Sequence, residues 1–191
     1  MHLQTLLEEQ DIMLEATFYE HIQRYKTHLL RWNKVHNLTG ARSEQAIDRF
    51  IYDAVVPVGF LPRVGSLMDI GTGAGFPGLI LAMALPHTQV TLVEPLGKRA
   101  SFLQFVKADL GLVNVTVKNC RVEAFCTEGF DLITSRAVTD TSVLLELSRA
   151  HIKAGTLILL YKGEQVFDEI EEGLNYEIIQ MHKRHYLLIR M

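Results

Sequence analysis

Four glycines crowd into one short stretch of this chain, between an apolar run and a helical pattern. The apolar run is Leu67–Ile70, and the helical pattern extends from Leu79 to Leu85. The glycines between them are Gly71, Gly73, Gly75 and Gly78. Glycine adopts positive φ and leaves no side chain in the path of a ligand, and this many glycines exceed what a tight turn requires. The pattern predicts a strand, a ligand-binding loop and a helix, which together open an α/β sheet.

The same alternation of strand and helix continues along the chain. Further strands are expected over residues 89–93, 115–117, 130–134 and 156–161, with helices over 98–109 and 143–151. Two short strands, 176–181 and 185–190, are expected to form an antiparallel hairpin at the sheet edge. Repeated βα units favour a parallel sheet with helices on both faces. We expect an α/β fold with a doubly wound, mostly parallel, seven-stranded sheet.

The residues before this alternation show a helical pattern. Apolar residues recur at steps of three or four from Ala16 to Val35, which draws one stripe along a helix. Ser43 suits the N-cap of a second helix, which carries Ile47, Phe50, Ile51 and Val55. We expect one domain, in which residues 1–62 are an N-terminal helical extension and residues 63–191 are a Rossmann-like core.

Composition narrows the class of protein. The chain has 191 residues, 48% of them hydrophobic and 21% charged, which is typical of a globular protein. The formal net charge of −3 gives no overall basic field. The spacing of Cys120 and Cys126 fits neither a disulfide framework nor a zinc site, and the histidines suggest no metal. Without a leader or an apolar stretch of about 18 residues, a cytoplasmic protein with no membrane contact is expected.

The glycine loop by itself leaves two kinds of ligand open. Residues 73–78 match the dinucleotide pattern G-x-G-x-x-G, and Glu94 lies close to the usual position of a ribose-binding acid. Asp69, just ahead of the first glycine, favours the second ligand. A carboxylate there would repel a pyrophosphate, but it would attract the sulfonium and ammonium groups of S-adenosylmethionine. We therefore expect this cofactor, in contact with Asp69 and the loop glycines.

Two other strand ends extend the expected cofactor site. Glu94 ends the second strand, where a carboxylate can accept both ribose hydroxyls in charge-assisted hydrogen bonds. Val122 and Glu123 follow the third strand and are expected to flank the adenine, one by packing and one by a polar contact. Glu123 equally suits a cap of the next turn.

Further motifs are spread along nearly the whole chain. They are Arg31-Trp32-Asn33-Lys34-Val35-His36-Asn37-Leu38-Thr39, Phe76-Pro77-Gly78, Gly97-Lys98-Arg99, Phe102-Leu103, Arg121-Val122-Glu123, Ser135-Arg136-Ala137 and Lys162-Gly163. With these motifs the chain resembles the bacterial guanine methyltransferases of small-subunit ribosomal RNA, also called glucose-inhibited division protein B. The part of the first motif from Asn33 to Thr39 and the segment Ser135-Arg136-Ala137 are together specific to this family.

The resemblance implies a reaction and a set of contacts. The family transfers a methyl group from S-adenosylmethionine to nitrogen 7 of a guanine in 16S rRNA, on a class I methyltransferase fold. Carried over position by position, the resemblance implies that the cofactor contacts Gly71, Phe76, Val122, Glu123 and Arg136.

The expected chemistry needs little acid–base catalysis. Nitrogen 7 carries an in-plane lone pair and no proton, so methyl transfer depends on alignment more than on a general base. The segment Ser135-Arg136-Ala137 offers neither the Asn-Pro-Pro-Tyr type of motif nor a cysteine nucleophile. Arg136 is the expected catalytic residue, because its fork of donors can hold the O6 edge of guanine or a phosphate, or brace the cofactor. A structural ion pair is the alternative role for Arg136.

RNA binding then requires a local basic patch. The residues expected to contact RNA are Lys98, Arg99, Arg121 and Lys162, extended by Asn33 and Asn37. We expect 16S rRNA as the partner, alone or within a small-subunit particle, and a monomeric enzyme. Two other functions stay open, namely a small-molecule methyltransferase and a non-catalytic regulatory protein that binds S-adenosylmethionine.

Overall fold

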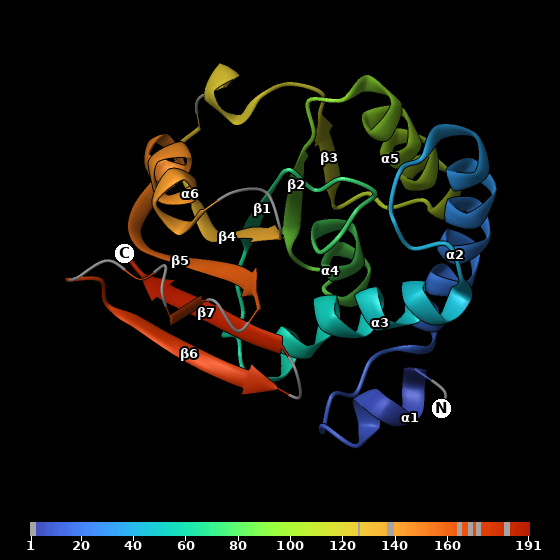
Figure 1. The fold of residues 1–191 in the computed structure, drawn as a ribbon, viewed down its shortest axis with the longest axis horizontal. Helices are drawn as coiled ribbons and strands as arrows, with labels where there is room; N and C mark the ends of the chain where they lie inside the picture. Colours follow the sequence, from blue (N-terminus) through green and yellow to red (C-terminus); the bar gives the residue numbers. More distant parts are fainter. Residues whose placement is uncertain are drawn as a thin grey trace.

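A seven-stranded sheet organises the computed structural model, which describes residues 3–125, 127–136, 140–163, 166–167, 170, 173–181 and 184–191 (Figure 1). The strands are β1 Ser66–Ile70, β2 Gln89–Val93, β3 Val115–Lys118, β4 Phe130–Arg136, β5 Ile152–Lys162, β6 Tyr176–Met181 and β7 Arg184–Arg190. Their order is β3-β2-β1-β4-β5-β7-β6, parallel up to β5, with β7 antiparallel to both of its neighbours. The expected doubly wound sheet and its terminal hairpin are confirmed.

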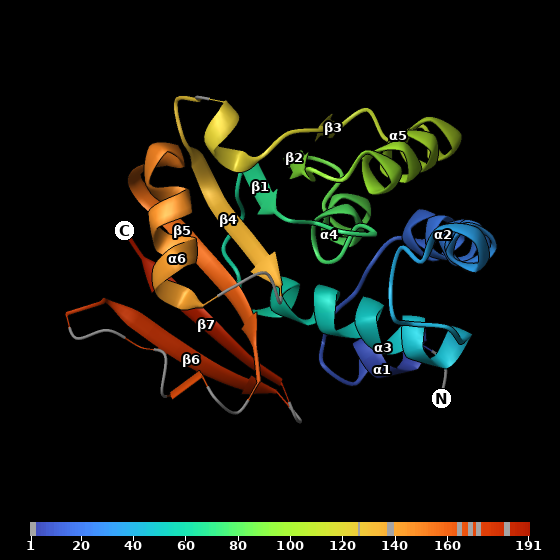
Figure 2. The ribbon, with the colours of Figure 1, turned by 45° about the horizontal axis from the view of Figure 1, so that its top comes forward.

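Helices cover both faces of this sheet. They are α1 Leu3–Glu8, α2 Ala16–His36, α3 Glu44–Val55, α4 Gly78–Ala84, α5 Gly97–Leu110 and α6 Thr141–Ser148, with 3₁₀ turns η1 Val56–Gly59, η2 Val122–Ala124 and η3 Arg149–His151. In Figure 2 the sheet lies between α6 and α4. Ser43 is the predicted N-cap of α3, since its hydroxyl accepts a hydrogen bond from the Ala46 backbone N–H at 3.2 Å. The short α1 was not predicted.

Alternating side chains along each strand build the core on the two faces. Leu67 of β1 packs with the helices α2–α5, whereas the next residue, Met68, packs on the face of α6. The same alternation separates Leu159 from Ile158 in β5. This two-residue period is the one that a strand dictates, and it places a buried apolar layer on each side of the sheet.

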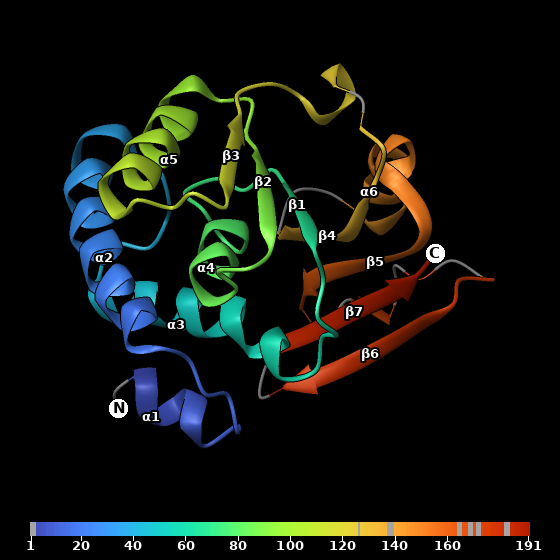
Figure 3. The same cartoon turned by 180° about the vertical axis from the view of Figure 1, so that it is seen from behind.

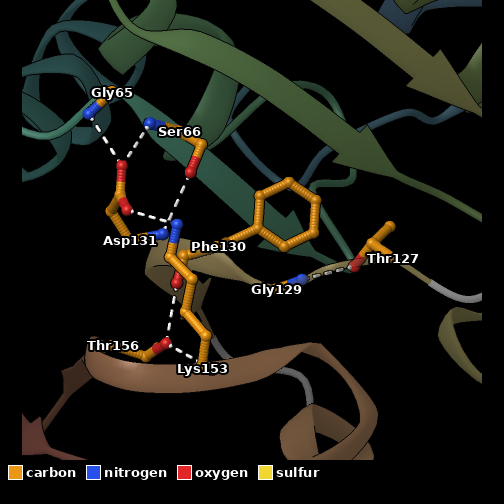
Figure 4. Close-up of polar contacts among 8 residues, drawn as sticks. All are labelled: Gly65, Ser66, Thr127, Gly129, Phe130, Asp131, Lys153 and Thr156. Carbon is orange, nitrogen blue, oxygen red and sulfur yellow. Dashed lines mark hydrogen bonds and ion pairs between the residues drawn. The ribbon is translucent and has the colours of Figure 1, made fainter.

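The amino ends of β1 and β4 are joined by a polar network (Figure 4). Asp131 Oδ2 accepts hydrogen bonds from the backbone N–H groups of Gly65, at 2.9 Å, and Ser66, at 2.8 Å. Lys153 Nζ pairs with Asp131 Oδ1 at 2.6 Å, and the Thr156 hydroxyl donates to the Phe130 carbonyl. Hydrogen bonds with Lys153 and these backbone groups lower the pKa of Asp131. The network fixes the register of the central strands at the end away from the glycine loop.

The N-terminal helices lie against one side of the sheet and its helices. Figure 3 shows α2 beside α5, and α3 beside α4. The Tyr25 hydroxyl donates a hydrogen bond to the Ala74 carbonyl at 2.8 Å, and Tyr161 of β5 donates to the Ala54 carbonyl at 3.0 Å. These bonds tie α2 to the glycine loop and α3 to β5. The division of the chain at about residue 62 stays a prediction.

Several sequence expectations concern membranes, metals and the cysteines. Within the described residues, no helix is both long and apolar enough to cross a membrane. Across the same part of the chain, no three histidine, cysteine, aspartate or glutamate side chains come together as metal ligands would. Cys120 is a free thiol. Cys126 and Ala137 lie outside the described residues.

Candidate functional site

A cavity of about 790 Å³ lies at the carboxyl ends of the parallel strands. The glycine loop, the residues that follow β2, and the ends of β4 and β5 contribute to its wall. The loop between α2 and α3, one side chain each of α3 and α6, and the start of β7 complete it. Ligands of doubly wound sheets bind at this edge, so the cavity is the candidate functional site.

The glycine loop is held from beneath by a buried carboxylate. Asp69 is fully buried; its Oδ2 accepts a hydrogen bond from the Gly78 N–H at 2.8 Å, and its Oδ1 accepts one from the Thr134 hydroxyl at 2.9 Å. A Cβ on Gly78 would lie 2.5 Å from Asp69 Cβ, so only glycine fits there. Burial raises the pKa of Asp69 to about 6, although these hydrogen bonds lower it. Asp69 is absent from the cavity wall.

These hydrogen bonds give Asp69 a structural role, and the direct cofactor contact expected of it stays a prediction. Both of its oxygens are used inside the protein, and the side chain has no exposed surface. The carboxylate fixes the first turn of α4 against β1 and β4. Its charge still acts on the cavity from below, because low-dielectric surroundings screen it weakly.

Gly73 opens the loop toward the cavity. Its φ is +61°, and a Cβ built there would have no heavy atom nearer than the Gly71 carbonyl oxygen at 4.0 Å. The empty space and the left-handed backbone together explain why glycine occurs at this position. Gly75, by contrast, is packed, since its Cβ would come within 2.8 Å of Leu79 Cβ. Gly71 and Phe76 line the cavity, but Gly75 does not.

Glu94 lines the cavity and braces two backbone segments. The residue is 2% exposed, and its Oε2 accepts a hydrogen bond from the Gly73 N–H at 2.9 Å. Its Oε1 accepts one from the Leu96 N–H, also at 2.9 Å. A carboxylate oxygen can accept two hydrogen bonds, so each oxygen retains one site for a ligand.

Arg136 ends β4 with its guanidinium against two aromatic rings. The Cζ atom lies 4.4 Å from the ring centroid of Phe50 and 4.8 Å from that of Phe76. Its Nη1 is buried and has no hydrogen-bond partner within the described residues. Burial lowers the pKa of this guanidinium, and the negative charge of Asp53 is the strongest influence in the opposite direction. A buried cation with an unused donor is suited to a polar ligand.

The start of β7 adds a second guanidinium to the cavity. Arg184 Nε donates a hydrogen bond to Asp53 Oδ2 at 3.1 Å, and its Nη2 donates to the same oxygen. The Tyr186 hydroxyl donates to the Asp53 backbone carbonyl at 3.0 Å. Asp53 therefore anchors β7 to α3 across 131 positions of sequence.

The loop between α2 and α3 depends on Asn33. Its amide nitrogen donates hydrogen bonds to the carbonyls of Thr39, at 2.9 Å, and Ala41, at 3.1 Å, and its oxygen accepts from the Thr39 N–H. The residue is 8% exposed. The Asn33 side chain thus holds the loop in place, and the RNA contact expected of it stays a prediction. Asn37 is exposed at the left-handed C-cap of α2, and its contact with RNA stays a prediction.

The other predicted site residues divide into two groups. Arg99 and Lys162 line the cavity. The residues outside its wall are Lys98, Arg121 and Glu123, which are exposed, and Val122, which is buried. Lys98 lies in the first turn of α5 after β2, and Arg121 precedes η2 after β3, so both follow strands at the carboxyl edge of the sheet. Their contacts with cofactor or RNA stay predictions.

Sequence reasoning missed part of the wall. The missed residues include Leu38, Thr39, Gly40, Phe50, Pro95, Leu96, Ser135, Leu144, Tyr161 and Arg184. Phe50 fits the apolar stripe of α3, which made it look like core. Arg184 carried a signal, since it is a basic residue just before a predicted strand, but its place depends on which strand β7 pairs with.

Comparisons with known proteins give one consistent family. A family profile described as rRNA small subunit methyltransferase G matches residues 18–189. A Wolinella succinogenes protein named Ribosomal RNA small subunit methyltransferase G is 49% identical over 176 residues, which span 92% of this chain and 91% of that one. A protein of the same name from Aliarcobacter butzleri is 44% identical over 98% of each chain. A solved methyltransferase from Geobacter sulfurreducens has a TM-score of 0.61 at 12% identity, covering 100% of this chain and 97% of that one, which supports the fold alone.

Proposed function

The chain belongs to the rRNA small subunit methyltransferase G family, and we propose that it transfers the methyl group of S-adenosylmethionine to nitrogen 7 of a guanine in 16S rRNA. One observation carries this proposal beyond the family. A single cavity joins an open glycine loop, a buried carboxylate at Glu94 and the unpartnered guanidinium nitrogen of Arg136.

The residues of the cavity fit the cofactor. Gly73 leaves room beside the loop, and each oxygen of Glu94 can accept one further hydrogen bond, as two ribose hydroxyls require. Bound there, S-adenosylmethionine supplies a methyl group activated by its sulfonium. Gly71 and Phe76 would hold the rest of the cofactor, and Val122 and Glu123 the adenine. Asp69 would add attraction for the positive end of the cofactor from beneath the loop.

The target base needs to be aligned more than deprotonated. Nitrogen 7 of guanine has no proton to lose, so its attack on the methyl carbon requires no general base. An arginine that bound both O6 and nitrogen 7 would occupy the lone pair that reacts. Arg136 therefore acts through O6 alone, where a charged donor holds the base and leaves nitrogen 7 free.

The charge around the cavity supports a polyanionic substrate. Among the described side chains of the wall, Arg99, Arg136, Lys162 and Arg184 are cationic and only Glu94 is acidic. Phosphate groups bind such clusters through long-range attraction and counterion release. We place the enzyme in the cytoplasm as a monomer, where it meets 16S rRNA either free or within a small-subunit particle.

Chemical cleavage of the product tests the methylated atom. Methylation at nitrogen 7 gives the purine a fixed positive charge, which makes the RNA sensitive to borohydride and aniline. Purified protein, S-adenosylmethionine and either 16S rRNA or small-subunit particles should yield one protein-dependent break. Arg136→Ala should weaken that break at least tenfold, because a lost charged hydrogen bond costs about 1.5–3 kcal/mol. Labelled methyl transfer into the RNA without a break would exclude nitrogen 7.

A further inference from the structure

Arg136 sits in a corner formed by two aromatic rings. The centroids of Phe50 and Phe76 are 5.5 Å apart, and their planes meet at 79°. The guanidinium carbon lies within 5 Å of both centroids, at 4.4 Å from Phe50 and 4.8 Å from Phe76. Cations bind the negative faces of aromatic rings, most strongly where water is excluded. We call Phe50 and Phe76 the aromatic corner.

This mode of binding leaves one donor of Arg136, Nη1, unused among the described residues. A carboxylate partner would take up N–H groups in the guanidinium plane, whereas a ring face takes none. Asp53 is the acid whose charge most favours the Arg136 cation, yet its Oδ2 accepts hydrogen bonds from Arg184. The Nη1 of Arg136 is accordingly buried without a partner within the described part of the chain.

The two rings of the aromatic corner have different origins. Phe76 belongs to the glycine loop and is 4% exposed, so it also supports the loop itself. Phe50 comes from α3, lines the cavity and is half-buried. The Phe50 ring also contacts Phe76. Without the Phe50 ring, Arg136 would lie against the ring of Phe76 alone. An aliphatic residue at position 50 would then let the guanidinium turn toward Asp53.

We propose that Phe50 is a positioning residue for methyl transfer, which holds Arg136 so that its N–H groups face the O6 edge of the target guanine. This inference rests on the proposed function. Helix α3 thereby contributes to the site, because it carries both Phe50 and Asp53, the carboxylate that would otherwise attract Arg136. The ring keeps the guanidinium in the cavity, while Arg184 keeps Asp53 occupied.

Three variants separate this role from simple packing. Phe50→Leu removes the ring face but keeps an apolar side chain, and Phe50→Tyr restores the ring. Phe105→Leu is the matched control, because Phe105 is 38% exposed, contacts the rings of His28 and Trp32, and lies outside the cavity wall. Phe50→Leu should lower kcat about thirtyfold, which corresponds to about 2 kcal/mol at 1.36 kcal/mol per factor of ten. Phe50→Tyr and Phe105→Leu should stay within threefold of the wild type.

A spectroscopic readout tests the contact without any substrate. The Arg136 Nε–H resonance of the free protein, assigned by its loss in Arg136→Lys, should carry a ring-current shift. The shift should change in Phe50→Leu, persist in Phe50→Tyr and be unaffected in Phe105→Leu. Calorimetry should give the same affinity for S-adenosylmethionine in all three variants.

The outcomes distinguish the two proposals. A wild-type enzyme that methylates rRNA together with a Phe50→Leu variant of equal kcat would overturn the role of Phe50. An Arg136 resonance that ignores Phe50→Leu would overturn it as well, as would a tyrosine that fails to restore kcat. A wild-type protein that shows the ring-current shift but no rRNA methylation would instead overturn the proposed function.

Discussion

Glutamine in place of Glu94 would exchange one carboxylate oxygen for an NH₂ group and remove the negative charge. Each oxygen of Glu94 accepts a backbone N–H, from Gly73 on one side and Leu96 on the other, both at 2.9 Å. Whichever way the amide lies, its NH₂ faces one of these donors. One hydrogen bond is therefore replaced by a contact between two donors, in a side chain that is 2% exposed.

The expected losses follow from these contacts. A hydrogen bond to a charged group contributes about 1.5–3 kcal/mol, so Glu94→Gln should lower the free energy of unfolding by about that amount. For a chain of this size, each kcal/mol shifts Tm by roughly 2–4 °C, which predicts a Tm about 3–12 °C lower. The ribose hydroxyls would also lose their charged acceptor. Affinity for S-adenosylmethionine should then fall roughly 10- to 150-fold beyond any effect of unfolding.

Calorimetry at a temperature where the variant remains folded measures the loss of cofactor affinity separately from the loss of stability. Glu146→Gln is the matched control, because Glu146 is exposed, pairs with Arg149 and is not part of the cavity wall. That change should alter stability by less than about 1 kcal/mol and leave cofactor affinity unaltered. A folded Glu94→Gln variant with wild-type affinity would refute the assignment of Glu94 to the ribose.

Two further predictions concern pH and salt. The pKa of Asp69 is about 6 in the folded protein, above the usual 3.8, so its ionisation opposes folding as pH rises through that window. Urea unfolding measures the free energy of unfolding of Asp69→Asn minus that of the wild type. This difference should rise by up to about 3 kcal/mol from pH 4 to pH 7. A difference that did not change with pH would contradict the raised pKa. Neutralising Lys98, Arg99 and Lys162 should weaken RNA binding and flatten its logarithmic salt slope by roughly 0.7–0.9 per lost phosphate contact, and equal slopes would show that these charges do not meet phosphate.

The fold was predictable because periodicity decides it locally. Strands from Leu67 to Ile70 and over 89–93 were placed within one residue, since apolar runs bounded by glycine or proline leave few alternatives. The short helix α1 escaped prediction, as its six residues provide too few turns for a clear stripe. Ends of elements were less well placed, because capping and strand pairing extend them, as in β5.

The site was predictable in position more than in detail. Glu94, Gly73 and Arg136 follow strands and could be placed at one edge of the sheet. Asp69 and Asn33 were assigned ligand contacts because a motif does not reveal burial, and their hydrogen bonds turned out to be internal. Internal hydrogen bonds of this kind are enough to make a motif recognisable, whether or not the residue also contacts a ligand. Phe50 was missed for the opposite reason, since an aromatic side chain on an apolar stripe looks like core.

The position of β7 between β5 and β6 has a consequence for the order of folding. The chain makes these strands in the order β5, β6 and β7, yet β6 is hydrogen-bonded only to β7 among the described strands. During synthesis, β6 must therefore wait for residues 184–190 before it can join the sheet. Asp53, made 131 positions before Arg184, waits much longer for its partner. Such distant pairings slow folding. A nascent chain therefore completes the strands beside the glycine loop well before β7 adds Arg184 to the cavity wall.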